Sequence, residues 1–325
     1  MLASGQAPTY LAVDAENVYW INALPQPTGA SGHSQVMRCA IGGCNDHPTV
    51  LWDGLYPIGG IAVEQGAVWW PTGPGAINAN YGEMPNVMSC AVGGCSNTPT
   101  SHLQWRGEFG AFAANATSWF VADVDAVVST CPLAGCGASP ATVFTDEYEI
   151  SSIALNGTDV YWANSAGNVL ACPLAGCGDA GAAIAGHSSP ANVLAADDSH
   201  LYWLVPGATR VGGGKIGPVT QWLEGGVYES PVPGGSDAGS IALASYASWL
   251  AGAAIAVDGT DVYWSVEDGS GTYGEIVRCS IGGCGGSPTP LAGTSSKSPS
   301  TGLAVDATNV YWSDPGRGAV MIAPK

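Results

Sequence analysis

Seven copies of one short pattern run through the chain, each made of an apolar run, a turn of acidic, amide or glycine residues, and an aromatic pair. The copies are LAVDAENVYW (11–20), IAVEQGAVWW (61–70), FAANATSWFV (112–121), IALNGTDVYW (153–162), LAADDSHLYW (194–203), IAVDGTDVYW (255–264) and LAVDATNVYW (303–312). Their anchors lie at 14, 64, 115, 156, 197, 258 and 306, so successive copies are between 41 residues (115 to 156) and 61 residues (197 to 258) apart. This spacing is typical of β-propeller blades and exceeds that of leucine-rich or ankyrin repeats.

Each copy predicts a strand, a tight turn and a second strand, because β-branched and aromatic runs flank residues that favour turns. Downstream, a third segment of the form GxVxxC and a fourth such as TVLW (49–52) bring the unit to four strands. The sequence therefore predicts an all-β fold, a seven-bladed β-propeller of four-stranded antiparallel blades, with residues 1–325 as one domain. The last copy ends after its third strand, so we expect Leu2–Ala3 to supply the fourth and close the ring.

The segment LAVDATNVYWSDPGRGAVMIAP (303–324) resembles the YWTD repeat of lipoprotein-receptor propellers and, more loosely, the NHL repeat. It is also similar to propellers of secreted bacterial proteins. The resemblance covers all seven copies, although YWTD propellers usually have six blades. It implies a binding platform more than an enzyme, and no catalytic motif of these families is matched.

The composition is strongly acidic, with 8 Lys and Arg against 26 Asp and Glu and a formal net charge of −18. This charge repels phosphate backbones and anionic membrane surfaces, so nucleic acid is not an expected partner. It fits solubility outside the cell or the recruitment of cations such as calcium. No apolar run is long enough for a membrane span, and no basic and then hydrophobic leader opens the sequence.

All ten cysteines fall into pairs of one spacing: Cys39/Cys44, Cys90/Cys95, Cys131/Cys136, Cys172/Cys177 and Cys279/Cys284. The fifth copy has Ser230 and Gly235 at these positions, so both members are absent together, as expected of disulfide partners that close the hairpin between third and fourth strands. A zinc site needs about four converging ligands where each blade offers two. A redox motif has two intervening residues, whereas these pairs have four. Disulfides favour an oxidising compartment, and we expect a periplasmic, secreted or surface-displayed protein.

The connections between second and third strands are predicted to be short in blades three, four and seven and long in the others. The longest is LVPGATRVGGGKIGPVTQWLEGG (204–226) in blade five. Two tryptophans there lie outside the repeated motifs, and with nearby residues they predict a ligand site near blades five and six: Trp222, Glu224, Tyr246, Trp249 and Tyr273. Aromatic rings beside carboxylates suit stacking on sugars or capture of a cationic ligand. The alternative is that these rings only pack the long loop onto the ring.

Four carboxylates fall in adjacent segments between blades, namely Glu108, Asp146, Glu147 and Glu149. Oxygen ligands of this kind predict a calcium or other cation site at the mouth of the central channel. The alternative is an ordinary solvated acidic rim.

The five histidines fall in different blades, and no nucleophile elbow, P-loop or H-E-x-x-H motif is present. We therefore expect a ligand-binding or protein-interaction propeller outside the cytoplasm, with a glycan, a small molecule or a protein as ligand. One alternative is a hydrolase or lyase that uses carboxylates and a divalent cation on the same face. Another is a structural coat or filament subunit.

Overall fold

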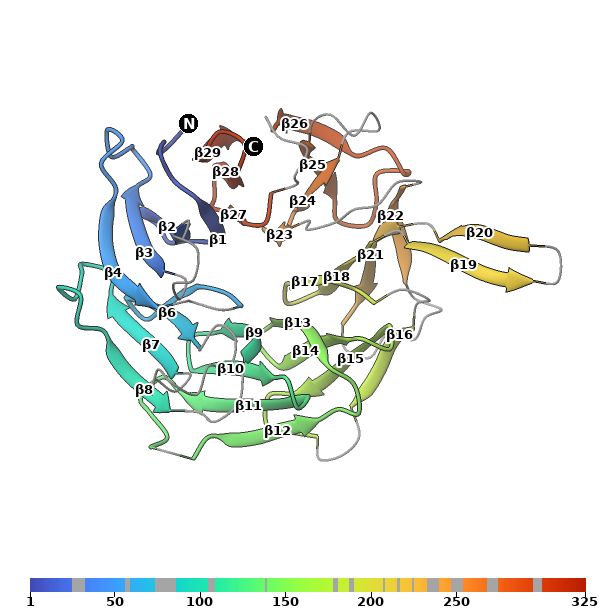
Figure 1. Ribbon diagram of the computed structural model, residues 1–325, viewed down its shortest axis with the longest axis horizontal. Helices are drawn as coiled ribbons and strands as arrows, with labels where there is room; N and C mark the ends of the chain where they lie inside the picture. Colours follow the sequence, from blue (N-terminus) through green and yellow to red (C-terminus); the bar gives the residue numbers. More distant parts are fainter. Residues whose placement is uncertain are drawn as a thin grey trace.

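The computed structural model is a ring of seven antiparallel β-sheets around a central axis (Figure 1). It describes residues 1–24, 33–55, 59–73, 86–104, 109–137, 139–177, 181–186, 190–206, 208–214, 217–223, 225–232, 240–246, 254–267, 274–294 and 300–325. Six of the sheets have four strands and the last has three, which confirms the predicted all-β, seven-bladed propeller. Within these ranges no helix has the length and hydropathy needed to cross a bilayer.

The first four blades use their strands in chain order from the axis outward. They are β1 (Pro8–Val13), β2 (Asn17–Leu24), β3 (His33–Ala40) and β4 (Thr49–Leu55); β5 (Ala62–Glu64), β6 (Ala67–Thr72), β7 (Asn86–Ala91) and β8 (Thr100–Gln104); β9 (Phe109–Ala114), β10 (Ser118–Asp123), β11 (Val127–Pro132) and β12 (Ala141–Thr145); β13 (Ile150–Leu155), β14 (Asp159–Asn164), β15 (Asn168–Pro173) and β16 (Ala182–Gly186).

The remaining blades follow the same order, except that blade five carries an insertion. They are β17 (Val193–Ala196), β18 (His200–Val205), β21 (Gly225–Pro231) and β22 (Ile241–Tyr246); β23 (Ile255–Val257), β24 (Asp261–Glu267), β25 (Gly274–Ser280) and β26 (Thr289–Gly293); β27 (Leu303–Val305), β28 (Asn309–Asp314) and β29 (Ala319–Pro324). The insertion is a hairpin of β19 (Ala208–Gly214) and β20 (Gly217–Leu223), which projects beyond the ring as an arm (Figure 1).

The N-terminal residues lie against the outer edge of blade seven. Leu2 N donates to the carbonyl oxygen of Val320 at 2.8 Å, and Ala3 forms an isolated antiparallel bridge with Val320. Gln6 N donates to the carbonyl oxygen of Gly318 at 2.7 Å. These contacts occupy the side of β29 on which the other blades have a fourth strand.

The aromatic pair of each second strand forms the packing between blades. Tyr161 and Trp162 are adjacent on β14 and therefore point to opposite faces of the sheet. Tyr161 packs toward blade five with Leu201, while Trp162 packs toward blade three with Phe120. Both rings are fully buried, which explains why the second strands are apolar on both faces.

The anchor residue holds the turn between first and second strands in every blade except blade two, where Gln65 and Gly66 form the turn with positive φ. Asp306 Oδ1 accepts the backbone N–H groups of Thr308 and Asn309, both at 2.7 Å, and its Oδ2 accepts the hydroxyl of Tyr311 at 2.6 Å. Burial pushes the pKa of Asp306 upward, but these hydrogen bonds outweigh it and the pKa lies below its usual value. The repeated Asp or Asn is thus explained by an Asx turn, and in blades one, four, five, six and seven its side chain also bonds the tyrosine hydroxyl.

All five predicted cysteine pairs are disulfide-bonded in the hairpin between the third and fourth strands. The bonds are Cys39–Cys44, Cys90–Cys95, Cys131–Cys136, Cys172–Cys177 and Cys279–Cys284.

The two members of a pair differ in position and burial. Cys131 is fully buried on β11, whereas Cys136 is half-buried in the turn that precedes β12 and packs against the core cluster around Trp119. The second cysteine therefore does not lie on the fourth strand. Each bond ties the turn to the third strand and closes the hairpin there, without joining one strand directly to the other.

The turn within each disulfide needs a residue with positive φ just before the second cysteine. The φ angles there lie between 99° and 114°, which glycine adopts without strain. The five glycines are Gly43, Gly94, Gly135, Gly176 and Gly283.

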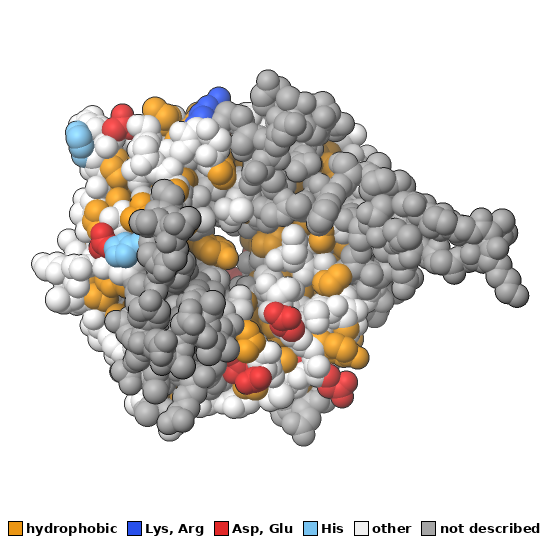
Figure 2. All heavy atoms as spheres, viewed as in Figure 1, with side chains coloured by type: hydrophobic (Ala, Val, Ile, Leu, Met, Phe, Trp, Pro, Cys, Tyr) orange, Lys and Arg blue, Asp and Glu red, His pale blue; other side chains and the backbone are white. Residues whose placement is uncertain are grey.

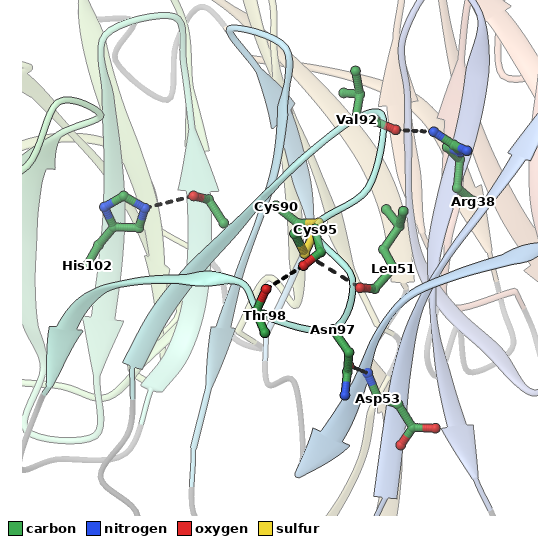
Figure 3. The surroundings of a disulfide bond; sticks show 10 residues. Arg38, Leu51, Asp53, Cys90, Val92, Cys95, Asn97, Thr98 and His102 are labelled. Carbon is green, nitrogen blue, oxygen red and sulfur yellow. Dashed lines mark hydrogen bonds between the residues drawn. A yellow bond between two sulfur atoms is a disulfide. The ribbon is translucent and has the colours of Figure 1, made fainter.

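The second sulfur of a disulfide can also contact the preceding blade. Cys95 Sγ lies 3.6 Å from the carbonyl oxygen of Leu51 on β4 (Figure 3), and Cys284 Sγ lies 3.7 Å from that of Leu243 on β22. Cys44 Sγ lies 4.0 Å from the carbonyl oxygen of Leu2. Leu2 therefore takes the same position against blade one that Leu51 on β4 takes against blade two and Leu243 on β22 takes against blade six.

Candidate ligand site at the channel mouth

A cavity of about 250 Å³ lies where the inner strands of all seven blades converge. Each blade contributes the start of its first strand or the residues just before it. The lining residues are Tyr10, Leu11, Gly59, Gly60, Ile61, Gly110, Ala111, Phe112, Ser151, Ser152, Ile153, Asn192, Val193, Leu194, Ala254, Ile255, Thr301, Gly302 and Leu303. Figure 2 shows a face of the molecule that is hollowed near its centre, with hydrophobic and uncharged side chains at the border of the hollow.

Close approach of neighbouring inner strands explains the small residues in this wall. A Cβ atom added at Gly302 would overlap the carbonyl oxygen of Thr9 and the side chain of Leu11 on β1. Gly60 has a φ of 151°, and an added Cβ would lie 3.1 Å from the carbonyl oxygen of Phe112. Seven strands can thus meet around the axis only where several positions lack bulk.

Tyr10 is the exception to this rule. Four residues before each anchor the other blades have small or medium residues, namely Gly60, Ala111, Ser152, Val193, Ala254 and Gly302. The Tyr10 side chain is 42% exposed, yet desolvation by the surrounding protein raises the pKa of its hydroxyl. Tyr10 also lines the cavity, so its exposed ring is part of the concave mouth.

The polar groups of the wall are hydroxyls and an amide. Ser151 Oγ lies 2.8 Å from the carbonyl oxygen of Ala191 and 3.1 Å from that of Ala163, and donates to this pair. Ser152 Oγ accepts the backbone N–H of Leu194 at 3.1 Å. Asn192 Oδ1 is buried without a hydrogen-bond partner in the structure. Among the described residues that line the cavity, none is Asp, Glu, Lys, Arg or His.

Of the five residues predicted to bind ligand near blades five and six, Tyr246 is the one whose side chain is described. Its hydroxyl accepts the indole N–H of Trp264 at 2.9 Å and so ties β22 to blade six. Burial, with a smaller contribution from the negative charge of Glu275, raises the pKa of Tyr246 to about 12.

Trp222 lies on β20 with its Cα opposite Thr209, near the root of the arm. Glu224, Trp249 and Tyr273 lie outside the described residues. The aromatic and acidic patch therefore stays a prediction.

The predicted cation site is described only in part, because Glu108 lies outside the described residues. Asp146 is engaged in packing: its Oδ2 accepts the indole N–H of Trp162 at 2.8 Å and the Asn164 amide at 3.0 Å. Glu147 and Glu149 are exposed. In the part of the chain that the structure describes, no three His, Cys, Asp or Glu residues lie close enough to hold a metal ion.

Tyr10, Ser151, Asn192 and Thr301 line the cavity but were not among the site residues predicted from the sequence. A signal for Tyr10 was present, because it is the one large aromatic residue among the seven equivalent positions. Ser151, Asn192 and Thr301 gave no such signal, since small polar residues before a strand are common in loops.

Comparisons with solved structures agree with the ring architecture. The chain is similar to a computationally designed protein named Ika8, with a TM-score of 0.60 and 15% identity over 100% of this chain and 99% of that one. A chain of the mitotic checkpoint complex gives a TM-score of 0.63 at 10% identity over 99% and 92%. BamB from Moraxella catarrhalis gives 0.51 at 13% identity over 97% and 82%.

These similarities support the fold alone, because the sequence identities are low. No protein-family model and no curated protein sequence matches the chain.

Proposed function

We propose that this protein is a ligand-binding propeller that acts in an oxidising compartment outside the cytoplasm and binds a small molecule at the mouth of its central channel. The observation that carries the proposal is the cavity of about 250 Å³ to which all seven blades contribute. Binding pockets are typically concave, largely preformed and lined by apolar groups with a few convergent polar ones. The channel mouth is concave, and its wall combines apolar side chains with backbone peptide groups, hydroxyls and one amide.

The face on which the channel opens supports the same proposal. The cavity lies at the starts of the inner strands, on the face that also carries the connections between second and third strands. Those connections are short in blades three, four and seven, at 124–126, 165–167 and 315–318, and long elsewhere. Uneven connections on a regular scaffold are a common mark of a binding face. Of the patch predicted near blades five and six, Tyr246 lies on the outermost strand of its blade and Trp222 on the arm, so the patch would act as a contact region separate from the cavity.

The compartment is inferred from the disulfides. Five bonded pairs without a free cysteine among the described residues are typical of proteins that fold in oxidising surroundings. The resemblance of the repeats to YWTD repeats and to propellers of secreted bacterial proteins also supports a location outside the cytoplasm.

The proposal is tested by blocking the cavity. Thr301 is exposed at the rim, so Thr301→Phe would fill the mouth while its backbone N–H can still donate to Ser313 Oγ. Ligand-observed NMR with a mixed set of sugars, amino acids, organic acids and nucleosides should detect binding to the wild type. We expect that binding to be lost in Thr301→Phe and kept in Val50→Phe, which changes an exposed position on β4. Equal binding to all three proteins would contradict the proposal.

A further inference from the structure

We propose that the channel-mouth cavity takes an uncharged, polyhydroxylated ring of the kind that a neutral monosaccharide presents. This inference rests on the proposed function and adds the chemical class of the ligand. Three properties of the described wall carry it: its lack of charged side chains, its exposed backbone and the exposed aromatic ring of Tyr10.

The charge of the wall argues against an ionised ligand. The described lining residues contain no Asp, Glu, Lys, Arg or His, so this part of the wall offers a charged ligand no counter-charge. Moving an unpaired charge out of water is strongly unfavourable. An anion would in addition approach a protein with a net charge of −18.

The backbone of the wall argues against a purely apolar ligand. The inner strands β1, β5, β9, β13, β17, β23 and β27 are the edge strands of their sheets. An edge strand presents peptide N–H and C=O groups that its own sheet does not pair. An apolar ligand would remove water from these groups without replacing the hydrogen bonds, whereas hydroxyl groups can both donate and accept.

Tyr10 supplies the flat face that a sugar ring needs. One side of a pyranose ring is a surface of C–H groups, and aromatic rings bind such surfaces by stacking. Tyr10 is a large side chain, 42% exposed, where the other blades have small or medium residues, while Ser151 in blade four and Thr301 in blade seven, next to blade one, supply hydroxyls to the wall. The volume of about 250 Å³ lies below the roughly 300–1,000 Å³ of pockets for drug-sized ligands, which favours a single ring.

The test uses saturation-transfer NMR with six sugars as probes. Glucose, galactose, mannose and N-acetylglucosamine are neutral, while glucosamine is cationic and glucuronate anionic at neutral pH. We expect at least one neutral sugar to bind the wild type, and Tyr10→Ala to weaken that binding by about tenfold. Tyr10→Phe keeps the aromatic face and should bind within about twofold of the wild type.

Tyr148→Ala is the matched control, since Tyr148 is similarly exposed, at 46%, and does not line the cavity. It should leave binding unchanged. Binding of charged sugars alone, lost in Thr301→Phe, would overturn the ligand class and leave the proposed function standing. No binding of any neutral sugar, or binding that Tyr10→Ala does not weaken, would also overturn the inference.

Discussion

The carboxylate of Glu229 on β21 accepts the backbone N–H of Gly282 in the next blade, with its two oxygens at 3.2 and 3.1 Å. The equivalent contact between blades one and two has the opposite polarity: Arg38 Nη1 donates to the carbonyl oxygen of Val92 (Figure 3). Val92–Gly93 and Ile281–Gly282 are equivalent central peptides of the disulfide-closed turns. The Ile281–Gly282 peptide is therefore flipped relative to Val92–Gly93, and the flip accompanies Glu229 at the position that Arg38 has in blade one. The φ of Gly282 is +85°, as a type II turn requires.

This relationship predicts different effects for two equivalent glycines. Gly282→Ala places a Cβ on a residue with positive φ and should lower the free energy of unfolding by about 1–2 kcal/mol. Gly93→Ala is the control, because φ of Gly93 is not in that region and an added Cβ meets no atom within 4 Å. It should be neutral or slightly stabilising. Urea unfolding measures both, and equal losses would contradict the assignment of the two turns.

The disulfides should contribute a large part of the stability. Each closes a loop of about six residues, which corresponds to roughly 2 kcal/mol in the chain-entropy model. Cys172→Ser together with Cys177→Ser should lower the free energy of unfolding by about that amount. Reduction of all five bonds should approach the roughly 5–15 kcal/mol that stabilises typical proteins. Circular dichroism melts with and without a phosphine reductant test this, and an unchanged Tm after complete reduction would show that the bonds contribute little.

The Asx turns predict a loss of stability in acid. Burial raises the pKa of Asp197, Asp258 and Asp306, but hydrogen bonds to their carboxylates outweigh it and the pKa of each is lowered. A pKa lowered in the folded state stabilises the protein above the unfolded pKa of about 3.9 and ceases to do so as the pH falls toward the folded pKa. The free energy of unfolding should therefore decrease below about pH 4.

Asp306→Asn tests this directly, because an amide can hold the same turn, as Asn156 does in blade four. Urea unfolding as a function of pH should show a shallower acid decrease for this variant than for the wild type. Asp125→Asn, at an exposed aspartate, should keep the full decrease. A shallower decrease in Asp125→Asn but not in Asp306→Asn would refute the assignment.

The arm of blade five should be dispensable for the ring. β18 pairs directly with β21 from His200 opposite Pro231 to Val205 opposite Gly226, so the sheet is complete without β19 and β20. Replacing residues 206–224 by Ser-Ala-Gly, the turn at 165–167 of blade four, should leave Tm within a few degrees of the wild type. A collapse of the melting transition on this replacement would show that the arm is part of the core.

The ring could be predicted from the sequence because each blade repeats the same local solution. The anchor turn, the buried pair such as Tyr161–Trp162 and the paired cysteines recur at matching positions, and each feature is local in the chain. Their recurrence is what identifies seven equivalent units.

The cavity could not be predicted in the same way, because its wall is assembled from seven segments that are distant in sequence. Asp146 shows that the role of a single side chain could not be predicted from the sequence either. Its charge suggested a cation ligand, but whether Trp162 and Asn164 occupy its oxygen depends on how the end of β12 meets β14. Such contacts between strands are fixed by packing and not by spacing in the chain.

The central claim is that the channel mouth binds a small molecule, and crystals soaked with a fragment library test it most directly. We expect bound fragments inside the cavity, in contact with the Tyr10 ring and within hydrogen-bond distance of the inner strands. A cavity that holds only water throughout the screen, while fragments collect at other surfaces, would contradict the claim.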